Sequence, residues 1–319
     1  MDELTYSQVE AAAERISGKV REVTVARADS DLAGSGRTEV YLALEFLQHT
    51  GTFKARGAQN FIQAHRDTGT LPDAGVTIAS GGNAGMACAW AAREQGVPAT
   101  VFLPATAPRV KVDRLRGYGA DVRLVGTEYA DALAACAEYA VTTGALTSHA
   151  YDHPLIAAGA GTLMMELHAQ LPDLHTVVVA VGGGGLFTGV AAAARQYGVH
   201  TVAVEPEGCR ALNAALQAGR PVDVSVDSVA ADSLGARRVS ELASRAALRG
   251  NVTSVTVPDS AIVSARQLLW DDYRLAVEHA AGAALAGLLD PAGYRPRPEE
   301  KVCVVLCGAN TDPSSLRWS

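Results

Sequence analysis

The stretch VGGGGL, residues 181–186, decides the fold of this chain. It follows an apolar, β-branched run at 176–181 and precedes an alanine-rich stretch at 189–198. Four consecutive glycines are unusual in an ordinary turn, because each glycine loses much conformational entropy when it is ordered. Their backbone N–H groups can converge on one anion, and the start of a helix favours the same ligand. The sequence therefore predicts an anion site, above all for a phosphate, between a strand and a helix.

Short β-branched runs alternate with alanine-rich helical stretches on both sides of this turn. The runs that we predict to be strands are 40–45, 76–80, 99–104, 120–125, 176–181, 200–205, 252–257 and 301–306. Several are apolar on both faces, which is typical of a parallel sheet covered by helices on both sides. Ser7 and Glu10 have the spacing of a capping box for a first helix. We predict an α/β fold whose ligands bind beyond the carboxyl ends of the strands.

Length and composition narrow the class of protein. A chain of 319 residues is long for one core and favours two domains. With 48% hydrophobic and 19% charged residues it is not a disordered chain. The net charge of −7, without a basic cluster, argues against nucleic-acid binding. An uncharged run at 176–194 is long enough to span a membrane, but the five glycines within it argue against a span.

The cysteines and the N-terminal segment indicate the cellular compartment in which the protein is expected. Five scattered cysteines, none in a CxxC pair, indicate free thiols in a reducing compartment and argue against a structural zinc site. The first sixteen residues hold several acids and no apolar segment, so they do not form a secretory signal. We therefore expect a cytoplasmic protein.

A second unusual stretch is TGTFKARG, residues 50–57, after the run 40–45. Lys54 is one of only four lysines in the chain, and it stands where a helix is predicted to begin. The helix dipole disfavours an ammonium group there, and burial would add to this effect. Both influences lower the pKa of the lysine and favour a reactive, neutral amine.

Two further stretches stand at strand ends. SGGNAG, residues 80–85, opens a helix, where backbone N–H groups can bind a carboxylate or phosphate and Asn83 is a natural N-cap. CGAN, residues 307–310, follows the last strand. The thiol of Cys307 could donate a weak hydrogen bond, or it could be a small core residue. The pair His149 and His153 could suggest a metal, but Pro154 interrupts the helix that this spacing requires.

A nicotinamide-dependent enzyme is a minority alternative. The glycines at 182–185 and 189 do not have the G-x-G-x-x-G spacing of a dinucleotide-binding turn. Glu205 does follow Gly185 by twenty residues, at the end of the next strand, where a ribose-binding acid would lie. Glu166 and His168 look like ordinary solvated helix positions.

Together the four stretches resemble the pyridoxal-phosphate enzymes of fold type II, the tryptophan-synthase-β-like superfamily, and in particular its serine/threonine dehydratase and serine racemase branch. Residues 52–57 match the family's lysine motif, 80–83 its Ser-x-Gly-Asn loop, 182–185 its phosphate cup and 307–310 its terminal motif. The resemblance covers nearly the whole chain. It implies two three-layer parallel-sheet domains, a large one of residues 1–70 and 151–319 and a small one of residues 71–150 inserted in it, and a homodimer.

The resemblance also implies roles for individual residues. Lys54 would bind the cofactor pyridoxal 5′-phosphate covalently, and Phe53 would pack against its ring. Asn83 would contact the ring oxygen, Cys307 would face the ring nitrogen, and the phosphate would be held by Gly182, Gly183, Gly184 and Gly185. The substrate carboxylate would be bound by Ser80, Gly81 and Asn83, with Thr50 or Thr52 nearby.

The reaction implied is α,β-elimination of a β-hydroxy amino acid such as L-serine or L-threonine, giving a 2-oxo acid and ammonia. Serine or aspartate racemisation, 3-hydroxyaspartate dehydration and β-replacement stay open as alternatives. Racemase relatives carry a serine where this chain has Gly81, which favours elimination here. Some relatives bind a divalent cation through a Glu and an Asp six residues later. Glu205 matches the first, but Ala211 stands at the second position, so we expect no metal site.

Overall fold

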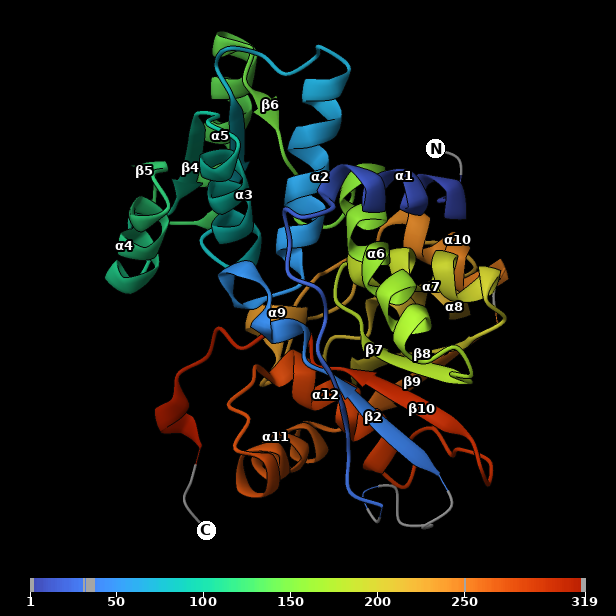
Figure 1. The fold of residues 1–319 in the computed structure, drawn as a ribbon. Helices are drawn as coiled ribbons and strands as arrows, with labels where there is room; N and C mark the ends of the chain where they lie inside the picture. The colour runs from blue at the N-terminus through green and yellow to red at the C-terminus, as the bar shows by residue number, and fades with distance from the viewer. Residues whose placement is uncertain (1–2, 31, 33–37, 250, 317–319) are drawn as a thin grey trace.

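The computed structural model describes residues 3–30, 32, 38–249 and 251–316. Its described strands form two sheets (Figure 1). The larger has the order β1-β2-β10-β7-β8-β9, with strands Val25–Arg27, Glu39–Ala43, Lys301–Val305, Thr176–Ala180, His200–Pro206 and Val252–Val257. Its pairs are parallel except for β1 with β2. The smaller is parallel, in the order β5-β4-β3-β6, with strands Asp121–Leu124, Ala99–Leu103, Val76–Ala79 and Leu146–Thr147.

This arrangement confirms the predicted α/β fold with two parallel-sheet regions. Each of the eight runs predicted as strands forms one, with small differences at the ends. The strands β1 and β6 were not predicted, because three and two residues are too few for a sequence pattern to be recognised. The carboxyl ends of the parallel strands meet at one edge of each sheet, and the ligand site is expected there.

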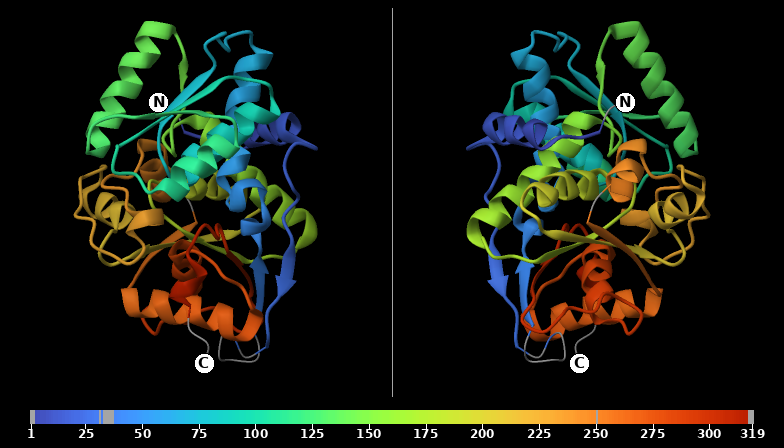
Figure 2. Two further views of the ribbon diagram at one scale, coloured as in Figure 1. Left: turned by 90° about the vertical axis from the view of Figure 1, so that its left-hand side faces the viewer. Right: turned by 90° about the vertical axis from the view of Figure 1, so that its right-hand side faces the viewer.

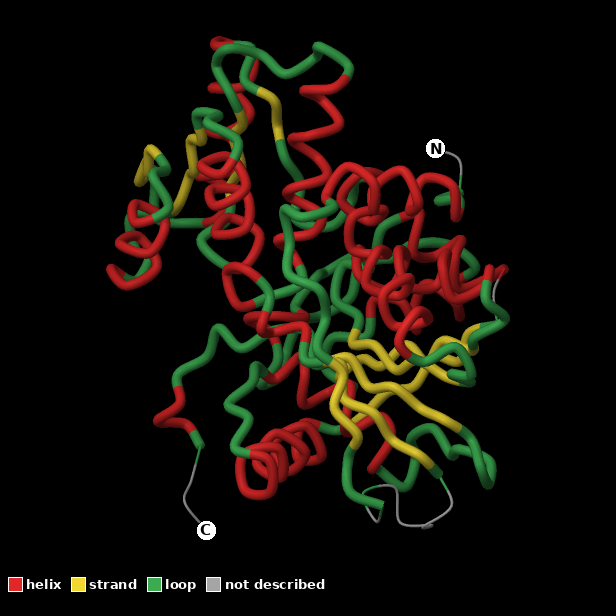
Figure 3. Tube along the Cα trace, viewed as in Figure 1, coloured by secondary structure: helices red, strands yellow, loops and turns green. Residues whose placement is uncertain are grey.

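The helices cover the sheets in layers. In Figures 1 and 3, helices α1, α6, α7 and α10 lie on one face of the six-stranded sheet and α11 and α12 on the other. The two side views of Figure 2 place the four-stranded sheet and α5 at the opposite end of the molecule from α11. The helix bounds are α1 Tyr6–Ile16, α2 Lys54–Asp67, α3 Asn83–Glu94, α4 Arg109–Gly117, α5 Tyr129–Thr143, α6 Pro154–Gln170, α7 Gly185–Gln196, α8 Ala211–Ala218, α9 Ala231–Leu234, α10 Glu241–Arg249, α11 Asp259–Tyr273 and α12 His279–Leu289.

The start of α1 and the lengths of the helices test two predictions from the sequence. The capping box predicted from Ser7 and Glu10 is wrong, because α1 begins two residues earlier. Thr5 is the N-cap, and its backbone N–H donates to Gln8 Oε1 at 2.9 Å. Across the described residues, none of the helices has the length and apolar character needed to cross a membrane.

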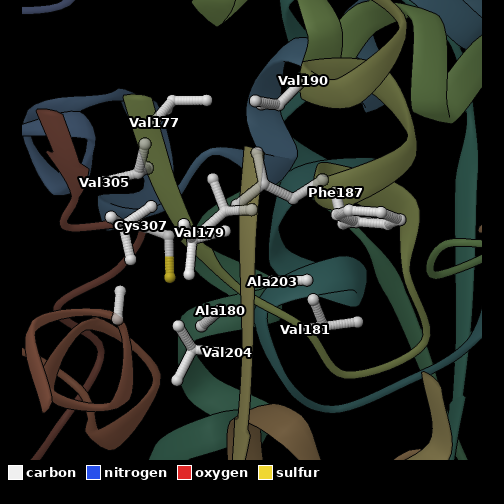
Figure 4. Packing of buried hydrophobic residues seen from close by; sticks show 14 of the residues in the cluster. Val177, Val179, Ala180, Val181, Phe187, Val190, Ala203, Val204, Val305 and Cys307 are labelled. Carbon is white, nitrogen blue, oxygen red and sulfur yellow. The ribbon is translucent and has the colours of Figure 1, made fainter. Parts of the chain in front are cut away.

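Each sheet has its own apolar core. Valines of β7, β8 and β10 fill the core of the six-stranded sheet, and Figure 4 shows Val177, Val179, Val204 and Val305 among them. The core around the four-stranded sheet includes residues of α2 as well, namely Ala55, Ala58, Phe61 and Ile62. Helix α2 thus contributes to the smaller core although it precedes residue 71. The boundaries at 70/71 and 150/151 stay a prediction.

Helix α6 packs closely against both α2 and α7, with a glycine at each crossing. A Cβ atom on Gly159 would lie 2.6 Å from the backbone oxygen of Arg56, on α2. A Cβ atom on Gly189, on α7, would lie 2.1 Å from the backbone oxygen of Ala157. Both distances are shorter than van der Waals contact, so the helices can approach this closely only with glycine. Helices α2 and α7 are therefore held at a fixed separation by the backbone of α6.

Candidate active site

Lys54 is the first residue of α2, and a tight turn leads into it. Thr50 and Gly51 both have left-handed backbone angles, with φ of 61° and 75°. Thr52 then forms an isolated antiparallel bridge with Gly308, and the N–H of Phe53 donates to the backbone oxygen of Cys307 at 3.0 Å. These contacts join the lysine turn to the end of β10. They bring the first and last of the four sequence motifs together.

The amine of Lys54 lies in a desolvated environment. Burial lowers its pKa from 10.5 to about 8, and the nearby Cys307 and Glu278 only partly oppose this. The structure therefore agrees with the lowered pKa that the sequence predicted. Nζ donates to the backbone oxygen of Ala150, which follows β6, at 3.1 Å. The amine thus lies between the ends of β10 and β6, and its lowered pKa makes a larger fraction of it neutral, and so nucleophilic or basic, than in an ordinary lysine.

The glycine loop between β7 and α7 is closed to side chains. A Cβ atom on Gly183 would lie 2.3 Å from the ring of Tyr151, and one on Gly184 would lie 2.3 Å from the Cβ of Ala243. Gly184, with φ of 98°, is the N-cap of α7. The predicted strand-to-helix placement of this loop is therefore confirmed. Its backbone N–H groups at the helix start are suited to an anionic group.

The Ser80–Asn83 loop opens α3, but its cap differs from the expected one. Gly82 is the N-cap and Asn83 is the first helical residue, so the prediction of Asn83 as N-cap is wrong. From that position the Asn83 side chain reaches out of the helix. Its Nδ2 donates to both carboxylate oxygens of Glu278, at 2.8 and 3.1 Å. Its Oδ1 accepts from Asn310 Nδ2 at 2.8 Å.

Glu278 and Asn310 are site residues to which we assigned no role from the sequence. Glu278 is buried just before α12, where it also accepts from the Asn310 backbone N–H at 2.9 Å. Burial raises the pKa of Glu278, although the hydrogen bonds from Asn83 and Asn310 oppose the shift. Asn310 Nδ2 further donates to the backbone oxygen of Thr50 at 2.8 Å. An acid directly before an apolar helix was the available signal for Glu278, and an amide that follows the last strand was the signal for Asn310.

Cys307 lies at the carboxyl end of β10, at the margin of the large core. Figure 4 shows it beside Val179 and Val305. It is 4% exposed, and burial raises the pKa of its thiol to about 12. The sulfur is therefore a neutral thiol near the amine of Lys54.

Two alternatives from the sequence lose support. Both carboxylate oxygens of Glu205 accept backbone N–H groups at the start of α8, from Leu212 and Asn213, at 2.7 Å each. Glu205 is fully buried, and burial raises its pKa to about 7. Both oxygens are therefore already engaged by the backbone of α8, which argues against Glu205 as a ligand of a ribose and against Glu205 as a ligand of a cation. Within the described ranges, no group of three or more His, Cys, Asp or Glu side chains could hold a metal ion.

Glu166 and His168 are not the solvated positions that we expected. Glu166 accepts hydrogen bonds from Arg56 and from the backbone of Val23, and the ring of His168 stacks on Tyr197 at 3.9 Å. The pattern along α6 did not reveal these contacts, because every partner comes from a distant part of the chain.

The assembled site fits a ligand that carries both an anionic group and an amine-reactive group. Among the described residues, the hydroxyls of Thr50 and Thr52 are buried without a hydrogen-bond partner, beside the turn that leads to Lys54. Unpartnered buried polar atoms are costly and point to a missing partner. The closed glycine loop supplies the complementary cradle of backbone N–H groups. A buried amine and an anion cradle are the features that a phosphorylated aldehyde requires, and the orphaned hydroxyls leave two further polar groups for a ligand.

Comparisons with known proteins agree with this chemistry. The family model "Pyridoxal-phosphate dependent enzyme" matches residues 20–308. A "Serine dehydratase-like" protein of Mus musculus is 39% identical over 85% of this chain and 85% of its own length. An L-threonine ammonia-lyase of Geobacter sulfurreducens is 34% identical over 98% of this chain and 77% of its own. The crystal structure of a pyridoxal 5′-phosphate-dependent aspartate racemase superposes with a TM-score of 0.90, at 31% identity over 100% of this chain and 99% of that one. The chain therefore belongs to the pyridoxal-phosphate-dependent enzymes of fold type II, and its cofactor is pyridoxal 5′-phosphate.

Proposed function

We propose that this enzyme catalyses the α,β-elimination of a β-hydroxy amino acid such as L-serine or L-threonine, releasing a 2-oxo acid and ammonia. The observation that carries the proposal is the amine of Lys54, desolvated so that its pKa falls to about 8, in a cavity that Ala84, at the start of α3, also lines. Gly81, which precedes this helix start, has no side chain. The serine dehydratase-like and threonine ammonia-lyase relatives support the same class of reaction.

The residues around Lys54 would each hold one part of the cofactor. We assign its phosphate to the backbone N–H groups of Gly182–Gly185, its ring to Phe53 and its ring nitrogen to the neutral thiol of Cys307. Asn83, which Glu278 and Asn310 hold in place, is assigned to the ring oxygen. When bound, pyridoxal phosphate links to amines through its aldehyde and withdraws electrons from the carbon that carries the amine.

The chain's own groups then bind the substrate and move the proton. We assign the substrate carboxylate to the helix start at Ser80, Gly81 and Asn83, whose N–H groups suit an anion. The hydroxyls of Thr50 and Thr52, which lack partners among the described residues, lie close by for the same group. The neutral amine of Lys54 takes the proton from Cα as a general base. The β-hydroxyl then leaves as water, taking up the proton that the ammonium group of Lys54 now carries, so that the amine is neutral again.

Helix α4, which follows β4 of the smaller sheet, helps to close the site. Lys111 Nζ lies 3.2 Å from Asp232 Oδ1, on α9, and Arg114 donates to Asn310 Oδ1 at 3.2 Å. Both contacts link α4 to residues of the chain that flank the larger sheet. We assign to them the exclusion of water from the reacting groups.

Racemisation is the second candidate, because the aspartate racemase superposes so well. Racemisation requires a proton donor on each side of the substrate, and Gly81 offers no side chain for the second side. Dehydration of 3-hydroxyaspartate and β-replacement use the same first step, so they differ from the proposal only in substrate or in the second reactant.

A substrate panel tests the proposal. Purified enzyme loaded with cofactor is incubated with L-serine, L-threonine and 3-hydroxyaspartate, and oxo-acid release is followed together with chiral chromatography of the remaining amino acid. A parallel reaction with L-serine and sulfide tests β-replacement. We expect oxo acid from at least one of L-serine and L-threonine and little of the opposite enantiomer. A D-serine yield that equals the pyruvate yield would move the assignment to a racemase.

A further inference from the structure

The imidazole of His149 is a polar group of the Lys54 cavity that has no role in the proposed function. His149 lines this cavity together with Phe53, Lys54 and Ala150. It lies in the connection from β6 to α6, one residue before the carbonyl that accepts from Lys54. The site therefore includes an imidazole within the same cavity as the reactive amine.

The imidazole of His149 is held in one orientation and one tautomer. Its Nδ1 accepts from the backbone N–H groups of Tyr151, at 3.2 Å, and Asp152, at 2.8 Å. Because both partners are donors, Nδ1 carries no proton in the neutral ring, and the proton must be on Nε2. The ring also packs edge-on against Tyr151, with centroids 5.0 Å apart. His149 is an exposed residue, and within the part of the chain that the structure describes no protein group bonds to Nε2, so this N–H group is open to water or to a ligand.

The charge state of His149 agrees with a neutral donor. Burial lowers its pKa, and the proximity of Lys54 acts in the same direction, while Asp152 opposes them. At neutral pH the ring therefore offers one N–H group at Nε2 and no positive charge.

The topology indicates which part of a substrate this donor faces. Strands β3 and β6 are parallel neighbours, with Thr77 paired to Thr147, so the loops that follow them lie side by side at one edge of the sheet. The loop after β3 is the helix start assigned to the carboxylate, and Lys54 is assigned to the amine. The third substituent of Cα is the substrate's side chain. With the carboxylate at the loop after β3 and the amine at Lys54, we infer that this side chain faces the loop after β6, which contains His149.

We propose that His149 determines substrate specificity by donating its Nε2–H to an oxygen atom on the β-carbon of the amino acid. This inference rests on the proposed function and adds the recognition of the β-oxygen. His149 keeps its proton throughout, because a neutral imidazole N–H is a hydrogen-bond donor and a very weak acid. Its contribution is the preference for a β-hydroxyl over a β-substituent that accepts hydrogen bonds poorly.

The test compares two substrates that differ in this one atom. L-Serine loses a β-hydroxyl, whereas β-chloro-L-alanine loses chloride, a weakly accepting group that departs without a proton. In His149→Phe we expect kcat/KM for L-serine to fall about tenfold, the value of one hydrogen bond, while kcat/KM for β-chloro-L-alanine stays within about twofold. His149→Gln, whose amide can place an N–H near Nε2, should restore most of the preference.

His153 provides the matched control. Its Nδ1 also accepts a backbone N–H, from Leu155 at 3.1 Å, but its ring packs against Phe61 and does not line the cavity. His153→Phe should lower the thermal midpoint and leave the ratio of the two kcat/KM values as in the wild type. Cofactor absorbance and thermal midpoints of all variants verify loading and folding.

A spectroscopic measurement is independent of turnover. In enzyme with ¹⁵N-labelled histidine, the His149 resonances, identified by their loss in His149→Gln, should show the neutral ring with its proton on Nε2 at neutral pH. A proton on Nδ1, or equal losses for both substrates in His149→Phe, would overturn the inference. If the wild type releases oxo acid from neither substrate, the proposed function fails instead.

Discussion

Glu166, on α6, accepts two hydrogen bonds from Arg56, on the lysine helix α2, at 2.6 and 2.8 Å. Glu45 accepts two more from the same guanidinium, at 2.6 and 3.0 Å. Arg56 is fully buried. Burial alone would lower its pKa, but the charge of Glu45 and the hydrogen bonds to both acids outweigh it and raise the pKa. A fully paired buried charge thus stands two residues after the reactive lysine.

Removing this charge is expected to destabilise the fold. Arg56→Met leaves Glu45 buried without its partner, so we expect the free energy of unfolding to fall by about 3–5 kcal/mol. Glu166→Gln should cost less, because the Glu166 side chain is 24% exposed and water can reach it. Guanidinium chloride denaturation of the two variants measures the difference. If the two variants lost equal free energies of unfolding, the unpaired carboxylate of Glu45 would not be the cause of the instability of Arg56→Met.

The sequence predicted the parts of this site that lie within short motifs. Lys54, the glycine loop and the strand ends follow from local patterns, because turns and helix starts are decided by neighbouring residues. Glu166 was misjudged, since its partner Arg56 is far away in the chain and only the packing of α6 on α2 brings them together. The N-cap role of Asn83 was likewise wrong, and its side chain bonds to Glu278 and Asn310, which lie in two other parts of the chain.

The first prediction on the chemistry concerns Lys54. Lys54→Ala should abolish both turnover and the visible absorbance of the bound cofactor, because the covalent link requires an amine. Lys111→Ala is the control, since Lys111 is half-exposed on α4 and pairs with Asp232. It should keep the cofactor. A cofactor that borohydride still fixes to another lysine in Lys54→Ala would contradict the assignment.

The burial of Lys54 predicts how the stability of the cofactor-free protein varies with pH. Its pKa is about 8 in the folded state and near 10.5 when unfolded, so between these values the unfolded chain holds more protons and stability rises with pH. Below pH 8 the buried charge costs a constant amount, about 3 kcal/mol. Relative to Lys54→Met, the wild type should therefore be less stable at pH 7 and comparably stable above pH 10.5. Thermal or denaturant unfolding of both proteins across this range measures the effect. A difference that does not change with pH would contradict it.

Cys307 is expected to act as a neutral group. Since burial holds its thiol pKa near 12, Cys307→Ser, also neutral, should keep most of the activity. Cys307→Asp places a carboxylate at the same position and should shift the products from elimination toward transamination, as measured by the ratio of oxo acid to aminated cofactor. An inactive Ser variant with normal folding and cofactor content would count against contact with the ring nitrogen.

Gly81→Ser should raise racemisation relative to elimination, because it supplies a hydroxyl on the helix start of α3. A Cβ atom at this position would lie 2.5 Å from Leu103 Cδ2, the flexible end of that side chain. Combining the change with Leu103→Ala makes room for it. Gly81→Ala with Leu103→Ala repeats the steric change without the hydroxyl. Chiral chromatography of L-serine incubations should show D-serine only with the serine variant, and identical behaviour of the two pairs would refute the idea.

The glycine crossings of α6 have a consequence for how such an enzyme diversifies. The separation between the amine and the phosphate cradle is fixed by main-chain atoms in contact. Even an alanine at position 159 or 189 would clash with the backbone of the neighbouring helix. A lineage that changes its substrate therefore has to do so without altering this spacing. We expect inherited variation in substrate choice to accumulate in the loops at the edge of the smaller sheet, where side chains can be exchanged one at a time while the catalytic spacing stays constant.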